Sequence, residues 1–240
     1  MKIVRWSALL VAAMLVAACG ANSGASSSAP SSASVPAGSS VPAAAGSPPA
    51  GAVLARQMNS AVAKATSVHI RAALSQGGNP VTTDLSLTRA NDMYGQLVYK
   101  NAPLTVLVTQ GHTYIKVTSA TLKALGLPSA ACVLMCNKYL KITAGQSQRM
   151  TGGLGWSSTV GSLNSILSLH YAGPATVNGQ PAWQMHAGTG AIYVAAQGPA
   201  YPLRIVTASD RVDFTQWNSV TIPPPPPASQ VVDISQLKHL

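Results

Sequence analysis

Apolar and polar side chains alternate along several short segments of this chain. In SVHIRAALS, residues 67–75, Val68, Ile70 and Leu74 lie two residues apart or a multiple of two. TTDLSLTR, MYGQLVYK and LTVLVTQGHTYIKVT continue the pattern, and the turn sequences QGGNP, RAND, KNAP and QGH separate them. Successive strand residues point to opposite faces of a sheet, so this period indicates strands with one buried face. Short strands joined by turns predict an antiparallel meander.

Helical spacing precedes and interrupts these strands. Helices are predicted over 52–67 (AVLARQMNSAVAKATS), over 119–127 (SATLKALGL) and, most clearly, over 157–173 (SSTVGSLNSILSLHYAG). The third carries an apolar stripe formed by Val160, Leu163, Ile166, Leu167 and His170. Strands are predicted at YLKIT and again in ATVNG, PAWQMHA, GAIYVAA, YPLRIVTAS and RVDFTQWNSVTI.

The order helix, strands, helices, strands predicts an α+β fold. We expect a curved antiparallel sheet, an unclosed half-barrel, with helices covering the concave face. A long meander with one apolar face must curl or be covered. Two interiors are compatible with this layout: a cavity between sheet and helices, or a fully packed core.

The N-terminus reads as an export signal. Lys2 and Arg5 precede the apolar stretch 6–18, which is shorter than the roughly 20 residues of a membrane span. VAAC, residues 16–19, resembles the bacterial lipobox, in which the cysteine thiol receives diacylglycerol and becomes the new N-terminus. We therefore expect Cys19 to carry diacylglycerol and further acyl chains such as palmitate; an ordinary cleaved signal with an incidental cysteine is the alternative. The predicted location is the extracytoplasmic face of the cell membrane, lipid-anchored.

Composition divides the rest of the chain. Residues 20–51 contain Ser, Ala, Gly and Pro with no charged or aromatic residue, so they cannot bury enough surface to order themselves. The predicted organisation is a signal peptide at 1–18, a disordered tether at 19–51, a folded domain at 52–222 and a proline-rich tail at 223–240. The tail opens with five prolines, which favour polyproline II and either end the fold or lie along its outside.

The charge balance is basic. The five acidic residues are all Asp, and 13 of the 15 Lys and Arg remain once Lys2 and Arg5 leave with the signal, so the mature net charge is +8. Such a chain suits anionic phospholipids or cell-wall polymers. Scattered basic residues that merely keep the protein soluble are the alternative, and nucleic acid is not expected in this compartment.

Cys132 and Cys136 remain once Cys19 is assigned to lipid. Two nearby thiols in an oxidising compartment tend to pair, which predicts a disulfide. Two free buried thiols and a metal site are the alternatives, although no histidine or second cysteine pair lies close in the sequence.

Catalytic motifs do not stand out. The chain has no Glu and hence no H-E-x-x-H motif, no G-x-S-x-G sequence and no glycine-rich phosphate loop. The five histidines, His69, His112, His170, His186 and His239, are expected to be structural or exposed. Asp210 and Asp213 flank Arg211 at a turn and are expected to be solvated. We predict a non-enzyme without cofactor or metal.

Six phrases of the sequence resemble a known family. SVHIRAAL, GHTYIKV, KYLKI, ATVNGQPAWQM, GAIYVAAQGPAYPLRI and VDFTQWNSVTIPPPP run in an order similar to actinobacterial lipoproteins of the LppX/LprG type, which share a fold with the carriers LolA and LolB. The resemblance covers residues 53–224. It implies a curved, unclosed antiparallel barrel with helices over its mouth and an acyl chain or lipidated molecule in the hollow. It also implies that the helix around Leu163, Ile166 and Leu167 is a lid and that inward strand faces line the cavity.

These implications define a candidate pocket and lid: Leu85, Leu87, Leu97, Val106, Val108, Leu163, Ile166, Leu167, Trp183, Met185, Leu203 and Ile205. Aromatic side chains on the strands are expected in the core, with a ring at a pocket mouth as the alternative. Two functions follow. One is a membrane-anchored lipoprotein that binds or carries a lipid, glycolipid or other amphipathic ligand. The other is a non-enzymatic envelope interaction or sensory accessory lipoprotein with a filled core, whose protein partner the sequence does not identify.

Overall fold

The structure is a computed structural model, and it describes residues 47–76, 79–99, 102–124, 126, 128–143, 145, 147–148, 154–166 and 169–233. The predicted signal peptide, Cys19, most of the predicted tether, Leu167 and His239 lie outside the described residues.

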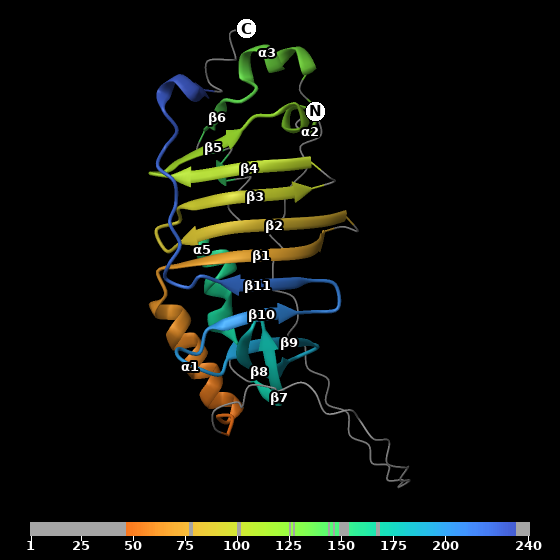
Figure 1. The fold of residues 1–240 in the computed structure, drawn as a ribbon, viewed down its shortest axis with the longest axis vertical. Helices are drawn as coiled ribbons and strands as arrows, with labels where there is room; N and C mark the ends of the chain where they lie inside the picture. Colours follow the sequence, from red (N-terminus) through yellow and green to blue (C-terminus); the bar gives the residue numbers. More distant parts are fainter. Residues whose placement is uncertain are drawn as a thin grey trace.

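One open sheet of 12 strands dominates the described part of the chain (Figure 1). Its order is β12-β6-β5-β4-β3-β2-β1-β11-β10-β9-β8-β7. The strands are β1 (Ser67–Gln76), β2 (Asn79–Thr88), β3 (Met93–Tyr99), β4 (Ala102–Thr109), β5 (His112–Lys116), β6 (Tyr139–Ile142), β7 (His170–Val177), β8 (Gln180–Ala187), β9 (Gly190–Ala195), β10 (Pro202–Val206), β11 (Arg211–Thr215) and β12 (Val231–Asp233). Two antiparallel meanders, β1–β6 and β7–β11, join where β1 pairs antiparallel with β11. The predicted α+β class and unclosed half-barrel are confirmed.

The register carries the alternating pattern across the sheet. Ile70 on β1 lies opposite Leu85 on β2 and Phe214 on β11, and all three are buried. The residues before and after each of them point to the opposite face of the sheet. We call the face that carries these buried apolar side chains the inner face. Gly95 on β3 stands opposite Leu85; a Cβ there would lie 2.0 Å from the carbonyl oxygen of Asp84, so the close approach of the strands requires glycine.

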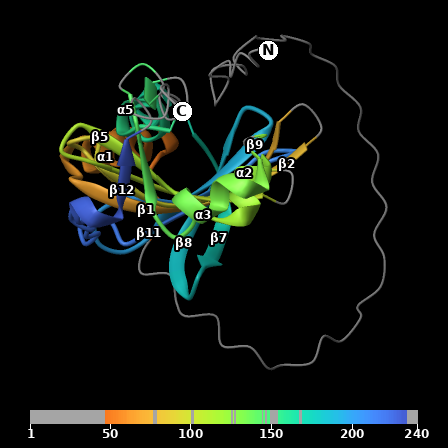
Figure 2. The ribbon, with the colours of Figure 1, turned by 90° about the horizontal axis from the view of Figure 1, so that it is seen from above.

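The helices are short apart from the first. They are α1 (Gly51–Lys64), α2 (Ser119–Ala124), α3 (Cys132–Met135) and α5 (Trp156–Thr159), with 3₁₀ turns η1 (Ser129–Ala131), η2 (Gly161–Ser165) and η3 (Ala228–Gln230). Figure 2, seen along the long axis, shows α1 and α5 together on one side of the sheet. Figure 1 shows α2 and α3 at the opposite end of the long axis from α1.

The predicted helix at 157–173 is wrong in its second half. Helical backbone ends with η2, and His170 begins β7 instead of ending a helix. The first half holds a glycine, an asparagine and four serines, and it forms only one short helix and a 3₁₀ turn. From His170 on, the segment pairs with β8, so tertiary pairing decides against the local period there.

The proline run lies along the side of the sheet (Figure 1). Thr221, Pro224 and Pro227 are exposed while Ile222, Pro223, Pro225 and Pro226 are half-buried, which is the three-residue period of polyproline II. Pro227 has φ −59° and ψ 145°, in that region. Beyond it, β12 pairs parallel with β6, so residues 231–233 of the predicted tail belong to the sheet.

Within the described part of the chain, no helix is both long enough and apolar enough to cross a membrane.

Candidate functional site: the apolar face of the sheet

Ten of the twelve candidate pocket and lid residues lie in one apolar layer on the inner face of the sheet. The buried members are Leu85, Leu87, Val106, Leu163, Trp183 and Met185, and the half-buried members are Leu97, Val108, Ile166 and Ile205. The structure therefore brings together residues that are up to 120 positions apart, from Leu85 to Ile205. Leu167 lies outside the described residues.

The prediction that Leu203 lines the inner face is wrong. Pro202 pairs with Val194 and Arg204 with Tyr193, so β10 carries a bulge at Leu203. The extra residue turns the Leu203 side chain to the outer face, where it packs with Val177 and Ala182. Ile205, two residues further on, returns to the inner layer, which is why strict alternation placed Leu203 beside it.

The cover over the inner layer consists of α1, α5 and η2. Leu54, Met58 and Val62 of α1 are buried in the layer, together with Trp156, Val160 and Leu163 from the second segment. The Asn59 amide nitrogen of α1 donates to the carbonyl oxygen of Ile166 at 3.1 Å and to that of Asn164 at 3.4 Å. The two parts of the cover are therefore tied to each other by polar contacts and meet the strands through apolar side chains.

Arg89 fastens one end of this cover, and sequence reasoning missed it. Its guanidinium donates to the carbonyl oxygens of Ala63 and Ala65, where helix α1 ends. The helix dipole also favours a positive charge at this C-terminal end of α1. The same guanidinium lies 5.9 Å from the centre of the Trp156 ring on α5. The RAND turn indicates only a boundary between strands, and no local pattern predicts these distant partners.

A second, smaller core occupies the same face at the β5–β6 end. Ile115 lies opposite both Val106 and Leu140, and it packs with Val117, Leu122 and Met135. Cys132 and Cys136 are half-buried against this core and are joined by a disulfide, with their Cα atoms 4.6 Å apart. The predicted pairing of these two cysteines is confirmed.

Two cavities among the described residues lie away from the middle of the inner layer. One, of about 300 Å³, lies at the β5–β6 end beside His112, Lys141 and Asp233. The other, of about 340 Å³, lies beside Leu203, Tyr201 and Trp217. Tyr201 and Trp217 stack with ring centres 4.7 Å apart, and Trp217 donates to the carbonyl oxygen of Pro202, so these rings are already partnered. The ten candidate residues of the inner layer are packed together with the side chains of α1, α5 and η2.

The outer face carries a charged row across four strands. In register, Arg204 of β10 lies opposite Asp213 of β11, Asp213 opposite Arg71 of β1, and Arg71 opposite Asp84 of β2. The charges alternate in sign along this row, which is the favourable arrangement for cross-strand neighbours.

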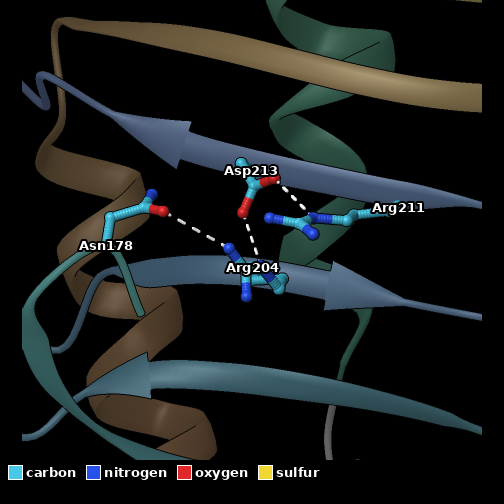
Figure 3. Close-up of polar contacts among 4 residues, drawn as sticks. All are labelled: Asn178, Arg204, Arg211 and Asp213. Atoms are coloured by element: carbon cyan, nitrogen blue, oxygen red, sulfur yellow. Dashed lines mark hydrogen bonds and ion pairs between the residues drawn. The ribbon is translucent and has the colours of Figure 1, made fainter. Parts of the chain in front are cut away.

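Asp213 is the most enclosed member of this row, contrary to the expectation that it is solvated (Figure 3). Its carboxylate oxygens lie 2.5 Å from Arg204 Nε and 2.7 Å from Arg211 Nε, and its side chain is 15% exposed. Burial raises the pKa of Asp213, but hydrogen bonds from Arg211 and Arg204 and their positive charges outweigh burial, so the net pKa lies below its ordinary value. Asp210 instead accepts from the backbone nitrogen of Ser75 at 2.8 Å.

His69 stands between a serine and a carboxylate on the same face. Its Nδ1 lies 3.2 Å from Ser86 Oγ, and its Nε2 lies 3.1 Å from Asp84 Oδ1. Acyl transfer by such a trio also needs N–H donors for the developing oxyanion. Here both strands are paired on each side, which commits their backbone N–H groups to the ladder, and Asp84 also accepts from Arg71. The trio therefore joins β1 to β2 as a polar contact.

No group of three or more His, Cys, Asp or Glu side chains in the described part of the chain could hold a metal ion.

No protein-family model and no curated protein matches the sequence. Solved structures do match. LprF from Mycobacterium bovis aligns with a TM-score of 0.55 at 13% identity, over 72% of this chain and 96% of that one. The chain has the fold of LprF. Mycobacterium tuberculosis lipoprotein LppX aligns at 13% identity over 72% of this chain and 97% of that one, with a TM-score of 0.46. The likeness to LprF confirms the fold that the resemblance to LppX/LprG-type lipoproteins implies.

Proposed function

We propose that this protein is a lipoprotein anchored through Cys19 at the extracytoplasmic face of the cell membrane, and that it binds or carries an amphipathic ligand with acyl chains. The ligand would lie between the inner face of the sheet and the cover formed by α1, α5 and η2. The observation that carries the proposal is a continuous apolar layer that runs from β8 to β4. The sheet does not close, and this layer lies beneath α1, α5 and η2.

The chemistry of this layer fits an acyl chain. Leu85, Val106 and Met185 present aliphatic carbon and a thioether, with no charged group among the buried members of the layer. An acyl chain that displaces the cover replaces its apolar contacts with the strands. Opening the cover costs about 25 cal/mol of free energy for each Å² of apolar surface exposed to water, and burial of the acyl chain must offset this cost. The likeness in fold to LprF is compatible with this use of the interior.

The cover would act as the gate. Its link to the strands is mainly apolar contact, while Asn59 holds α1 and η2 together, so the two segments would move as one piece. Ile166 is half-buried at the edge of the layer and Asn164, two residues earlier, is exposed. A carboxylate at position 166 would enter the path of an acyl chain without lying in the closed core.

Native mass spectrometry tests the proposal on the chain of residues 20–240, which keeps every described element, produced in an actinobacterial host. A bound mass that matches a lipid and is lost on denaturation supports a carrier. Ile166→Asp should reduce the occupied fraction at least tenfold, while the matched variant Asn164→Asp should leave it unchanged. A ligand-free mass, with no uptake of offered phospholipid or glycolipid, would sink the proposal in favour of a filled-core interaction protein. Retention of ligand by a folded Ile166→Asp chain would reject the gate.

The anchor has its own test. Radioactive palmitate should label the full chain, and Cys19→Ala should abolish the label and release the protein from the membrane fraction. Labelling of the Cys19→Ala chain would contradict the lipobox prediction.

A further inference from the structure

A second apolar surface lies at the far end of the molecule and faces solvent. We name it the knuckle, residues Cys132–Cys136, which comprise α3 and its closing disulfide. Val133 is 90% exposed and Leu134 59% exposed, whereas Met135 is 5% exposed. One turn of helix therefore divides its side chains between the core and the surface, and the outward pair is apolar.

The base of the knuckle is held firmly. The disulfide closes it, and Met135 packs in the second core with Leu122 and Leu140. The backbone N–H of Asn137 donates to the carbonyl oxygen of Val117 and that of Val117 to the carbonyl oxygen of Lys138, both at 2.9 Å. Val133 and Leu134 are thus presented by a fixed support and cannot retreat into the core without breaking it.

The charged side chains described around the knuckle are mainly lysines. From Met93 to Ser209 the sequence contains no acidic residue. Lys116, Lys123 and Lys138 are exposed at this end of the described chain. Among the described acidic residues, Asp233 lies at this end, opposite Lys141 in the β12–β6 pair. An apolar tip within a lysine-rich, acid-poor surface suits a membrane with anionic headgroups, because apolar side chains enter the headgroup region while lysines meet the phosphates.

We propose that the knuckle docks the protein on an anionic lipid surface, with Val133 and Leu134 inserted among the headgroups. The knuckle lies at the end of the long axis opposite α1, where the chain enters the domain (Figure 1). Residues 20–50, if extended at about 3.3 Å per residue, would reach roughly 100 Å, so an anchor at Cys19 would allow the far end to reach the same bilayer. This docking does not depend on any ligand in the interior of the sheet.

Vesicle flotation of residues 20–240 tests the proposal without the lipid anchor. The chain should float with phosphatidylglycerol vesicles, at least tenfold less with phosphatidylcholine vesicles, and less in high salt. The double variant Val133→Ser/Leu134→Ser should lose about tenfold in partitioning. Val53→Ser, a matched change at an exposed valine on α1, should leave flotation unchanged. Unchanged flotation of the double variant, or an equal loss with Val53→Ser, would overturn the proposal.

A fluorescent variant locates the contact and guards against misfolding. Leu134→Trp, with its disulfide intact and its near-ultraviolet circular dichroism otherwise native, should shift its added emission to the blue on phosphatidylglycerol vesicles. Brominated acyl chains should quench that emission. Emission that stays unshifted and unquenched while the chain floats would place the contact elsewhere and reject the knuckle. Replacing Lys123 and Lys138 by Glu should lower flotation and reduce its salt dependence; flotation that stays the same would reject the role of these charges.

Discussion

At the scale of single residues, arginines stabilise contacts between parts of the structure that the sequence pattern around them does not predict. Arg89 joins the end of α1 to Trp156 of α5, and Arg204 and Arg211 enclose Asp213. The Arg89 contacts join separate elements and Arg204 reaches Asp213 from the neighbouring strand, so these contacts report on tertiary organisation, whereas Arg211 and Asp213 lie on the same strand. Two predictions belong to this scale.

Arg89→Ala should lower the free energy of unfolding by about 1–3 kcal/mol, because the C-terminal carbonyl groups of α1 lose a charged donor. Chemical denaturation measures the change. Arg56→Ala, at an exposed arginine on the same helix, should stay within about 0.5 kcal/mol of the unaltered protein. Equal effects of the two substitutions would show that Arg89 does not fasten the cover.

Asp213 should contribute to acid sensitivity. Its pKa is lower in the folded chain than the ordinary value of about 3.9, so its stabilising contribution is present above that value and is lost as the pH falls through the folded pKa. Asp213→Asn should reduce stability at pH 7 and flatten the decline below about pH 4. Unfolding followed from pH 7 to pH 2 checks this, with Asp92→Asn as control; parallel curves for Asp213→Asn and the unaltered protein would contradict the assignment.

At the scale of elements, the sheet ends differently at its two edges. On one side, β12 adds a short parallel strand to β6 after the proline segment has run along the sheet. Val232 of β12 packs against the second core. On the other side β7 is the edge, and its first four residues, 170–173, belong to the segment predicted to be helical.

Ending the chain after Pro227 should remove β12 and expose the backbone of β6. We expect a loss of about 1–3 kcal/mol in the free energy of unfolding and a greater tendency to aggregate, since an unpaired edge invites pairing between chains. Ending the chain after Asp233 is the matched control and should be close to neutral. Thermal unfolding and light scattering measure both effects; a chain ended at Pro227 that matches the control would show that β12 does not stabilise the edge.

At the scale of the whole molecule, one sheet connects two cores of unequal size. The large core lies beneath α1, α5 and η2, and the small one beneath the knuckle. In the small core the disulfide closes a five-residue loop, for which the chain-entropy relation gives about 2 kcal/mol.

Amide hydrogen exchange should therefore resolve two levels of protection. Amides of β1, β2 and β11, in the middle of the sheet, should exchange most slowly, and those of β6 and β12 faster. Reduction of the Cys132–Cys136 disulfide should accelerate exchange in β6 and leave β11 unchanged. Uniform acceleration over all strands would mean that the two cores unfold as one unit.

The sequence by itself determined most of the strand pattern and the fold class, because a period of two and a buried face depend only on local order along the chain. Together with the family resemblance it also named twelve candidate pocket and lid residues, ten of which lie in the apolar layer. The pairing of Cys132 with Cys136 could also be predicted, because the two cysteines lie only four positions apart in the sequence. Only the tertiary structure decided that residues from His170 on form a strand and that a bulge turns Leu203 outward. It also decided the enclosure of Asp213 and the contacts made by Arg89. Each of these depends on a partner brought from elsewhere in the chain, where pairing energy exceeds the small local preferences that a sequence pattern records.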